Sequence, residues 1–507
     1  MNTTTLPQIP VRKMSWPWPK HVGFFLQFAS LLIPLLFLAF MFWQDPFSEM
    51  SDFDHDEGIN LIKASLYSQH YILYGEIWSD QPPFFTVLLA WWFSVVGTSV
   101  AAARSLVALF SALLLWSFYL AVRNSVTAFA AVGATLLLAV SQYYIRLSGS
   151  VMIGLPALAL ATLSIALLVR RKEQLWPLLL SAFVMALALE TKLLVVLLMP
   201  AIGLYLLLTK PPAAVTYLFT QRLLRPMLWG AVVAAAFFAL SLYFGALNFD
   251  MLINTHLGAQ QREQMVLARG NLRFLARFLL QHAVYLPLAF LGVLYAFRQR
   301  KPDLILPVVW FGTLFIVFMV HWPLWYHYTV LLTLPSPGFV PSASMLGLQG
   351  LSGWPADLQA FRYASALLVS AALLLCLLFY AYPSPLPRRL AEQAQLSRPI
   401  YLRQMMRQLL ADTRANRAFI FTDRPFYAFQ AGLPVTPQTA VMSRKRIETG
   451  VRVEADVLKT LTTYQPEYII LQRFTDKYSP AVMAEIARAY ELVLELPPGY
   501  YYRRNSR

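Results

Sequence analysis

Residues 23–43 read GFFLQFASLLIPLLFLAFMFW, a run of 21 residues without a charged side chain. A helix of about 20 apolar residues is long enough to cross the hydrocarbon core of a bilayer. A cleavable signal peptide would have a shorter apolar region that ends in small residues, whereas this long run follows Arg12, Lys13 and Lys20. We therefore predict an uncleaved first span, with residues 1–22 as a cytoplasmic N-terminal segment.

The composition extends this interpretation to most of the chain. Apolar residues make up 58% of the 507 residues and charged residues only 13%, which excludes a disordered chain, a disulfide-stapled secreted module and an ordinary soluble enzyme. Of the 66 charged residues (41 basic plus 25 acidic), 30 lie in positions 388–507. This distribution predicts a transmembrane domain over residues 23–387 and a soluble domain over residues 388–507. The only cysteine, Cys376, cannot form an internal disulfide.

The spans can be counted from the apolar runs and oriented by the basic loops. Basic residues cluster at 170–172, 222–225 and 298–301, and all three clusters face the cytoplasm only if residues 82–97 do not cross the membrane. We therefore predict that residues 82–97 form an in-plane or re-entrant helix in an outer loop, residues 44–99. The fold expected is an all-α membrane protein of about eleven spans with its C-terminal domain extracytoplasmic. The ten spans after the first are 100–122, 126–145, 148–169, 174–190, 193–209, 228–247, 280–297, 304–322, 326–347 and 362–382.

The C-terminal part alternates helix-like and strand-like runs, which is typical of a small α/β domain. It follows a proline-rich linker at 382–387. Strands are predicted over 418–423, 467–472 and 491–496, and helices over 400–413, 453–463 and 479–490.

Acidic residues concentrate in the outer loop. Eight of the 14 Asp and Glu residues in the first 387 positions fall between 45 and 80. A solvated loop accounts for Asp45, Glu49 and Asp52. The run FDHDEGINLIKA (53–64) instead places Asp56 and Glu57 at the start of an amphipathic helix, against the membrane surface.

A second polar motif, Asp80-Gln81-Pro82-Pro83, directly precedes the in-plane helix. Two prolines at the opening of a helix fix the angle at which the chain enters it. A helix start with a capping aspartate explains this motif equally well.

Basic residues lie at the predicted outer ends of spans: Arg104, Arg146 and Lys192. Snorkelling to the headgroups would explain any one of them. Three that converge on the face carrying the acidic loop favour a phosphate-binding site.

The cluster HWPLWYHY (321–328) supplies His321, His327 and Tyr328 at the same predicted face. An interfacial aromatic belt accounts for most of this cluster. The two histidines could bind phosphate, but no carboxylate accompanies them, so we predict no metal site.

Other sequence signatures are lacking. There is no Walker loop, dinucleotide fingerprint, HExxH or Gly-x-Ser-x-Gly motif, which argues against an ATP-driven pump. The membrane half shows no repeat and no pair of broken helices, which weakens the case for a secondary transporter. Positive-inside topology explains the net charge of +16, so no nucleic acid partner is expected.

The order of these motifs resembles the bacterial branch of the C-type (GT-C) membrane glycosyltransferases, which are related to protein O-mannosyltransferases and lipid A aminoarabinose transferases. The resemblance is strongest over residues 45–210 and covers the general plan to about residue 385. The segments that carry it are FDHDEG (53–58), DQPP (80–83) before a Trp-rich helix, AARSLVALFSALL (102–114), the arginine that ends the third span, and LETK (189–192).

The resemblance implies a sugar transferred from a polyprenyl-phosphate carrier to an acceptor lipid, glycan or protein outside a bacterial plasma membrane. It implies that Asp56 is the general base and that Arg104, Arg146 and Lys192 lie near the carrier phosphate; we expect Glu57 to support the base or to bind sugar hydroxyls. It implies no cofactor, although a divalent cation would be compatible.

The sequence departs from the family pattern in two places. Gln81 stands where some relatives carry a phosphate-binding lysine. No acid occurs in LSGSVMIGLP (147–156), where relatives often have one after the arginine of the third span. A non-enzymatic flippase or transporter of polyprenyl-linked sugars is the alternative function, and an assembly subunit with a degenerate site is a third.

Overall fold

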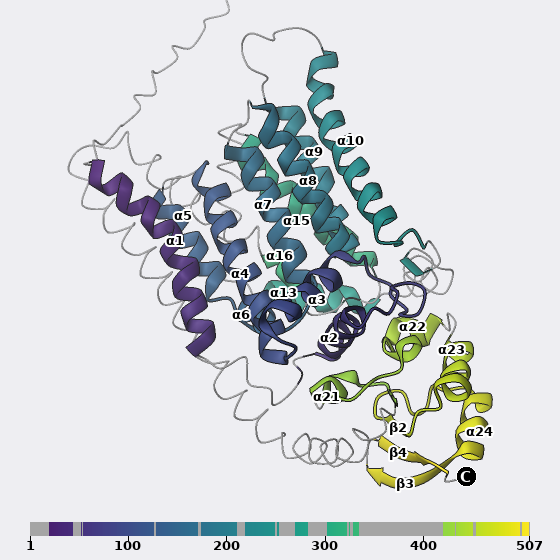
Figure 1. Ribbon diagram of the computed structural model, residues 1–507. Helices are drawn as coiled ribbons and strands as arrows, with labels where there is room; N and C mark the ends of the chain where they lie inside the picture. Colours follow the sequence, from purple (N-terminus) through teal and green to yellow (C-terminus); the bar gives the residue numbers. More distant parts are fainter. Residues whose placement is uncertain are drawn as a thin grey trace, which may run out of the picture.

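The computed structural model describes residues 20–43, 52, 54–125, 128–170, 174–209, 219–248, 251–252, 269–281, 302–321, 324, 328–333, 419–430, 432–449, 453–496 and 499–505. A body of long apolar helices stands beside a small α/β domain formed by the C-terminal residues (Figure 1). Helices α2 and α3 lie at the end of the helical body that faces this domain (Figure 1).

The helical body follows the predicted order of apolar runs. Its elements are α1 (Lys20–Trp43), α2 (His55–Ser68), α3 (Phe84–Val96), α4 (Val100–Arg123), α5 (Ala128–Ala139), α6 (Gln142–Ser148), α7 (Gly154–Arg170), α8 (Leu175–Thr191), the 3-10 helix η1 (Leu193–Leu198), α9 (Met199–Leu208), α10 (Phe219–Tyr243), α13 (Arg269–Gln281), α15 (Pro302–Val320) and α16 (Thr329–Thr333).

Several predicted spans differ from the observed helices, two of them in their course through the chain. Residues 126–145 are divided, because α5 ends at Ala139 and α6 begins at Gln142. The helix predicted from residue 148 begins only at Gly154. The reason lies in Val151, whose backbone bonds to α2: its N–H donates to Glu57 Oε1 at 3.0 Å and its carbonyl accepts from Asn60 Nδ2 at 2.9 Å.

Apolar side chains face outward along several of these helices. Within the described residues, two helices are long and apolar enough to cross a membrane, α4 and residues Leu223–Tyr243 of α10. On α10, Leu224, Met227 and Leu242 are each more than 60% exposed, a pattern that lipid contact explains. The total of eleven spans stays a prediction, since 362–382 and most of 280–297 and 326–347 lie outside the described residues.

The C-terminal domain contains one mixed sheet, in the order β1-β2-β4-β3. Strand β1 (Ile420–Thr422) pairs with β2 (Tyr468–Leu471) in parallel, and β4 (Gly499–Arg504) is antiparallel to both β2 and β3 (Tyr490–Leu496). The three predicted strands are present, and sequence analysis missed β4. The helices are α21 (Pro425–Gln430), α22 (Arg444–Thr449), α23 (Val453–Lys459), the π-helix η6 (Thr460–Tyr464) and α24 (Pro480–Ala489), besides the 3-10 turn η5 (Pro437–Thr439). The predicted helix 400–413 lies outside the described residues.

The domain docks directly on α2 and α3. A Cβ atom placed on Gly58 would lie 2.6 Å from the backbone nitrogen of Phe426, so α2 and α21 are in backbone contact. Phe429 stacks on Phe93 of α3 at 5.8 Å between ring centroids. Arg424 Nη2 forms an ion pair of 2.8 Å with Asp52 Oδ1. These contacts hold the C-terminal domain against the start of α2.

We expect the substitution Gly58→Ala to loosen this docking, because the neighbour of the added methyl group is backbone that cannot rotate away. Overpacking of this kind costs about 1–3 kcal/mol. The matched control is Gly203→Ala, also within a helix, where no atom lies within 4 Å of the added Cβ. Thermal unfolding in detergent should show a lower Tm for Gly58→Ala and an unchanged or higher Tm for Gly203→Ala. Equal Tm values would contradict the close approach.

Candidate active site

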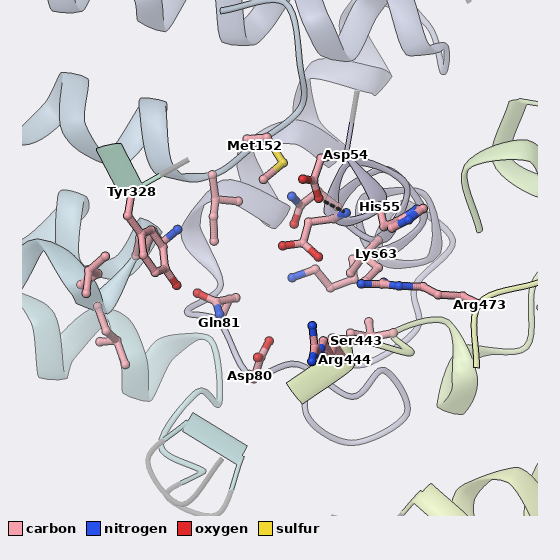
Figure 2. Close-up of a pocket in the computed structure, with 18 of the residues that line it drawn as sticks. Asp54, His55, Lys63, Asp80, Gln81, Met152, Tyr328, Ser443, Arg444 and Arg473 are labelled. Atoms are coloured by element: carbon pink, nitrogen blue, oxygen red, sulfur yellow. Dashed lines mark hydrogen bonds between the residues drawn. The ribbon is translucent and has the colours of Figure 1, made fainter. Parts of the chain in front are cut away.

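A cavity of about 210 Å³ lies where the helical body meets the C-terminal domain. Figure 2 shows side chains from both parts pointing into it. Its walls come from the first half of α2, the segments before α3, α7 and α16, the turn after α8, the end of α15, and the segments of the C-terminal domain at the start of α22 and after β2. The polar lining residues are Asp54, His55, Asp56, Asn60, Lys63, Asp80, Gln81, Lys192, His321, Tyr328, Ser443, Arg444 and Arg473.

Asp56 is one of the aspartates that line the cavity. Asp54 caps α2, its Oδ1 accepting the N–H of Asp56 at 3.0 Å, so helix start and side chain are fixed together. Burial, reinforced by the negative charges of Asp54 and Asp80, raises the pKa of Asp56 to about 6, although Arg473 and Lys192 oppose the shift. A carboxylate of this kind is ionised at neutral pH and is a stronger proton acceptor than an exposed aspartate.

Lys63 is a cavity residue that sequence analysis missed. Its side chain is only 1% exposed, and its Nζ lies 3.4 Å from Ser79 Oγ. Burial lowers its pKa, an effect that the negative charges of Asp80 and Asp56 partly offset. The spacing Asp56, Asn60, Lys63 (i, i+4, i+7) places all three on one face of a helix, and this pattern could have identified the lysine.

Asp80 and Gln81, two of the predicted site residues in the outer loop, line the cavity. The backbone here is fixed by side chains: Gln81 carbonyl accepts from Tyr74 Oη at 2.8 Å and from Ser79 Oγ at 3.0 Å. These bonds hold the segment that enters α3 while leaving the Asp80 and Gln81 side chains directed to the cavity (Figure 2).

Lys192 lines the cavity from the turn between α8 and η1. Its Nζ sits 4.8 Å from the centroid of the Tyr328 ring, in a cation–π arrangement. The His321 ring lies 5.7 Å from Tyr328. The structure thus brings together the three predicted residues Lys192, His321 and Tyr328, whereas His327 lies outside the described residues.

Glu57 and Arg104, two of the predicted site residues, do not line the cavity. Arg104 Nε and Nη2 donate to the two carboxylate oxygens of Glu57 at 2.8 and 2.9 Å. Both side chains are almost fully buried, at 1% and 0% exposed. Because both charges are removed from water, each needs the other as its counter-ion. The ion pair therefore links α2 to α4.

Arg146, a third predicted site residue, is exposed in the last turn of α6 and does not line the cavity. The position where relatives carry an additional acid is filled by Met152 and Ile153, which line the cavity with apolar groups. The cationic groups of the cavity are instead Lys63, Lys192 and two arginines of the C-terminal domain.

These arginines, Arg444 and Arg473, are the second group that sequence analysis missed. No local pattern marks them, since their approach to Asp56 depends on how the C-terminal domain docks. No group of three His, Cys, Asp or Glu side chains suited to a metal ion occurs in the described part of the chain.

Residues 80–244 match the family model of dolichyl-phosphate-mannose-protein mannosyltransferases. No curated protein sequence matches the chain.

Among solved structures, ArnT from Cupriavidus metallidurans bound to undecaprenyl phosphate is similar over 96% of this chain and 98% of its own, with 15% identity and a TM-score of 0.56. The apo form of the Archaeoglobus fulgidus oligosaccharyltransferase is similar over 97% of this chain and 75% of its own, with 13% identity and a TM-score of 0.57.

The family-model match over residues 80–244 and the shared architecture agree with the resemblance predicted from the sequence: this chain has the fold of the GT-C glycosyltransferases.

Proposed function

We propose that this protein is an inverting glycosyltransferase that moves a sugar from a polyprenyl-phosphate carrier to an acceptor hydroxyl on the extracytoplasmic face of a bacterial plasma membrane. The observation that carries the proposal is the placement of one basic carboxylate, Asp56, in a cavity lined by Lys63, Lys192, Arg444 and Arg473. ArnT, a structural relative, binds undecaprenyl phosphate.

The proposed reaction is a single displacement at the anomeric carbon. The acceptor oxygen forms a bond to this carbon as the bond to the carrier phosphate oxygen breaks, and the acceptor proton passes to Asp56. Base assistance of this kind is worth typically ~10²–10⁴-fold in rate. The phosphate leaves as a stable anion, so a second carboxylic acid to protonate it is unnecessary, unlike in glycoside hydrolysis.

Cations stabilise the charge that develops on the leaving phosphate. Lys192 lies on the side of the cavity formed by the apolar helices, held near Tyr328. This position suits the phosphate of a carrier whose hydrocarbon tail remains in the membrane. Lys63, buried within α2, supplies a positive charge where Gln81 is neutral.

The test is transfer of radiolabel from polyprenyl-phosphate sugars in membranes with and without the protein. We expect label to reach a lipid, glycan or protein only where the protein is present. Label that crosses vesicle membranes on the intact carrier, with no transfer, would support the flippase alternative and contradict an enzyme.

The pH dependence of kcat/KM should report Asp56. Its raised pKa means that the carboxyl is protonated, and inactive as a base, below pH about 6. The rate should therefore fall about tenfold per pH unit below that value and level off above it. Because Asp80 raises the pKa of Asp56, the variant Asp80→Asn should move this acidic limb to lower pH. A limb near pH 4 in the wild type, or none, would contradict the assignment.

A further inference from the structure

The wall of the cavity formed by the C-terminal domain carries its own cationic group. Arg473 follows β2, and Arg444 begins α22; both line the cavity with Ser443. Figure 2 shows Arg473 entering from the C-terminal domain, with Arg444 and Ser443 beside the lower part of the cavity.

The segment that carries Arg473 is rigidly built. Asp423, 1% exposed at the end of β1, accepts the backbone N–H groups of Gln472, Arg473 and Phe474 at 2.8, 2.9 and 2.9 Å. The guanidinium carbon lies 4.7 Å from the centroid of the Phe474 ring. An arginine whose backbone and side chain are both fixed loses little conformational entropy when it binds a ligand.

The same arginine retains hydrogen-bonding capacity. Its Nη1 is buried and has no hydrogen-bond partner among the described residues. A buried donor left unbonded is costly, and a planar guanidinium matches the oxygens of a phosphate or carboxylate. The site is therefore suited to an anionic group that enters the cavity.

The position of Arg473 distinguishes this anion from the carrier phosphate. Tyr328, which holds Lys192, and Arg473 lie at opposite ends of the cavity (Figure 2). Asp56 lines the same cavity, and its charge interacts with both Arg473 and Lys192. In a single displacement, the acceptor oxygen attacks the anomeric carbon from the side opposite the leaving phosphate. The base lies on the acceptor side.

We propose that the acceptor is an anionic glycan or lipid, and that Arg473, with Arg444, binds its phosphate or carboxylate group while the acceptor hydroxyl meets Asp56. This inference rests on the proposed function, and it assigns the C-terminal domain the recognition of the acceptor class. It also explains the docking of that domain on α2, because the docking brings Arg473 to the helix that carries Asp56.

The first arm of the test examines the product. Labelled product made by wild-type membranes is applied to an anion-exchange column; we expect it to be retained. Loss of retention after phosphatase treatment identifies a phosphate, and loss after carbodiimide amidation identifies a carboxylate. A labelled product that passes through uncharged would overturn the inference while leaving the glycosyltransferase assignment intact.

The second arm uses the purified protein with the acceptor fraction from those membranes. Arg473→Gln should raise the acceptor concentration needed for half-maximal rate by about tenfold or more, as expected for the loss of a charge-assisted hydrogen bond. Arg473→Lys should recover part of this loss. The control Arg488→Gln removes an arginine that is 72% exposed on α24 and should change neither constant.

The third arm separates acceptor from carrier. Binding of undecaprenyl phosphate should be equal in the wild type and in Arg473→Gln, and weaker in Lys192→Gln. A matching loss of undecaprenyl phosphate binding in Arg473→Gln would overturn the inference, because the arginine would then serve the carrier. This binding measurement does not require transfer, so it is interpretable even if the proposed function fails.

Discussion

Replacing Asp56 by Asn should lower kcat by at least ~10²–10⁴-fold. The amide preserves the size of the side chain and accepts hydrogen bonds, but it cannot take up the acceptor proton. Because Asp54 caps α2 and Asn keeps the size of the Asp56 side chain, folding should be unaffected. The measurement is the steady-state rate of label transfer from a polyprenyl-phosphate sugar, at saturating donor.

The matched control for this variant is Asp476→Asn, which changes an exposed aspartate of the C-terminal domain whose side chain is 71% exposed. Its rate should equal that of the wild type. The Asp56→Asn protein should still bind undecaprenyl phosphate, since the cations of the cavity remain. If Asp56→Asn lost carrier binding and rate together, a role in binding would replace the role as a base.

Replacing Arg104 by Met should destabilise the protein by about 3–5 kcal/mol, because it leaves the Glu57 carboxylate buried without its partner. The loss of stability should extend to the segment around Val151, because the Val151 N–H also donates a hydrogen bond to Glu57. Thermal unfolding in detergent, followed by tryptophan fluorescence, would show a lower Tm.

The double variant Glu57→Leu, Arg104→Met separates a structural pair from a phosphate site. It removes both charges and keeps apolar bulk in their place, so it should recover most of the lost stability. An arginine that binds the carrier phosphate would behave differently: Arg104→Met would weaken undecaprenyl phosphate binding at an unchanged Tm. That result would restore the original prediction for Arg104.

The sequence contained most of the helical plan, because lipid imposes a simple rule on it. Every apolar run long enough to cross a bilayer had to be helical, and the helix predicted at 82–97 is observed as α3. The break before α7 could not be foreseen, since it depends on hydrogen bonds between Val151 and residues of α2 that lie more than 90 positions earlier.

The candidate site was predictable where its residues are neighbours in the chain. Asp56, Asp80 and Gln81 lie in one loop, and the family resemblance pointed to them. Arg104 was assigned to the phosphate because an isolated charge at membrane depth suggests function. The sequence alone did not reveal that Glu57, 47 positions away, would neutralise it.

The cations that do line the cavity were hidden for two reasons. Lys63 sits on the Asp56 face of α2, and reading that helix at its own period would have shown it. Arg473 reaches the cavity only through the docking of α21 on Gly58 and the anchoring of its loop by Asp423. Contacts of this kind depend on tertiary packing, which local patterns do not encode.

The most direct test of the central claim is a single-turnover experiment with purified protein in lipid nanodiscs. Wild type and Asp56→Asn are each loaded with the same radiolabelled polyprenyl-phosphate sugar, and the acceptor fraction is then added. We expect equal loading by both proteins and rapid transfer by the wild type alone. Transfer at the wild-type rate by Asp56→Asn would contradict it.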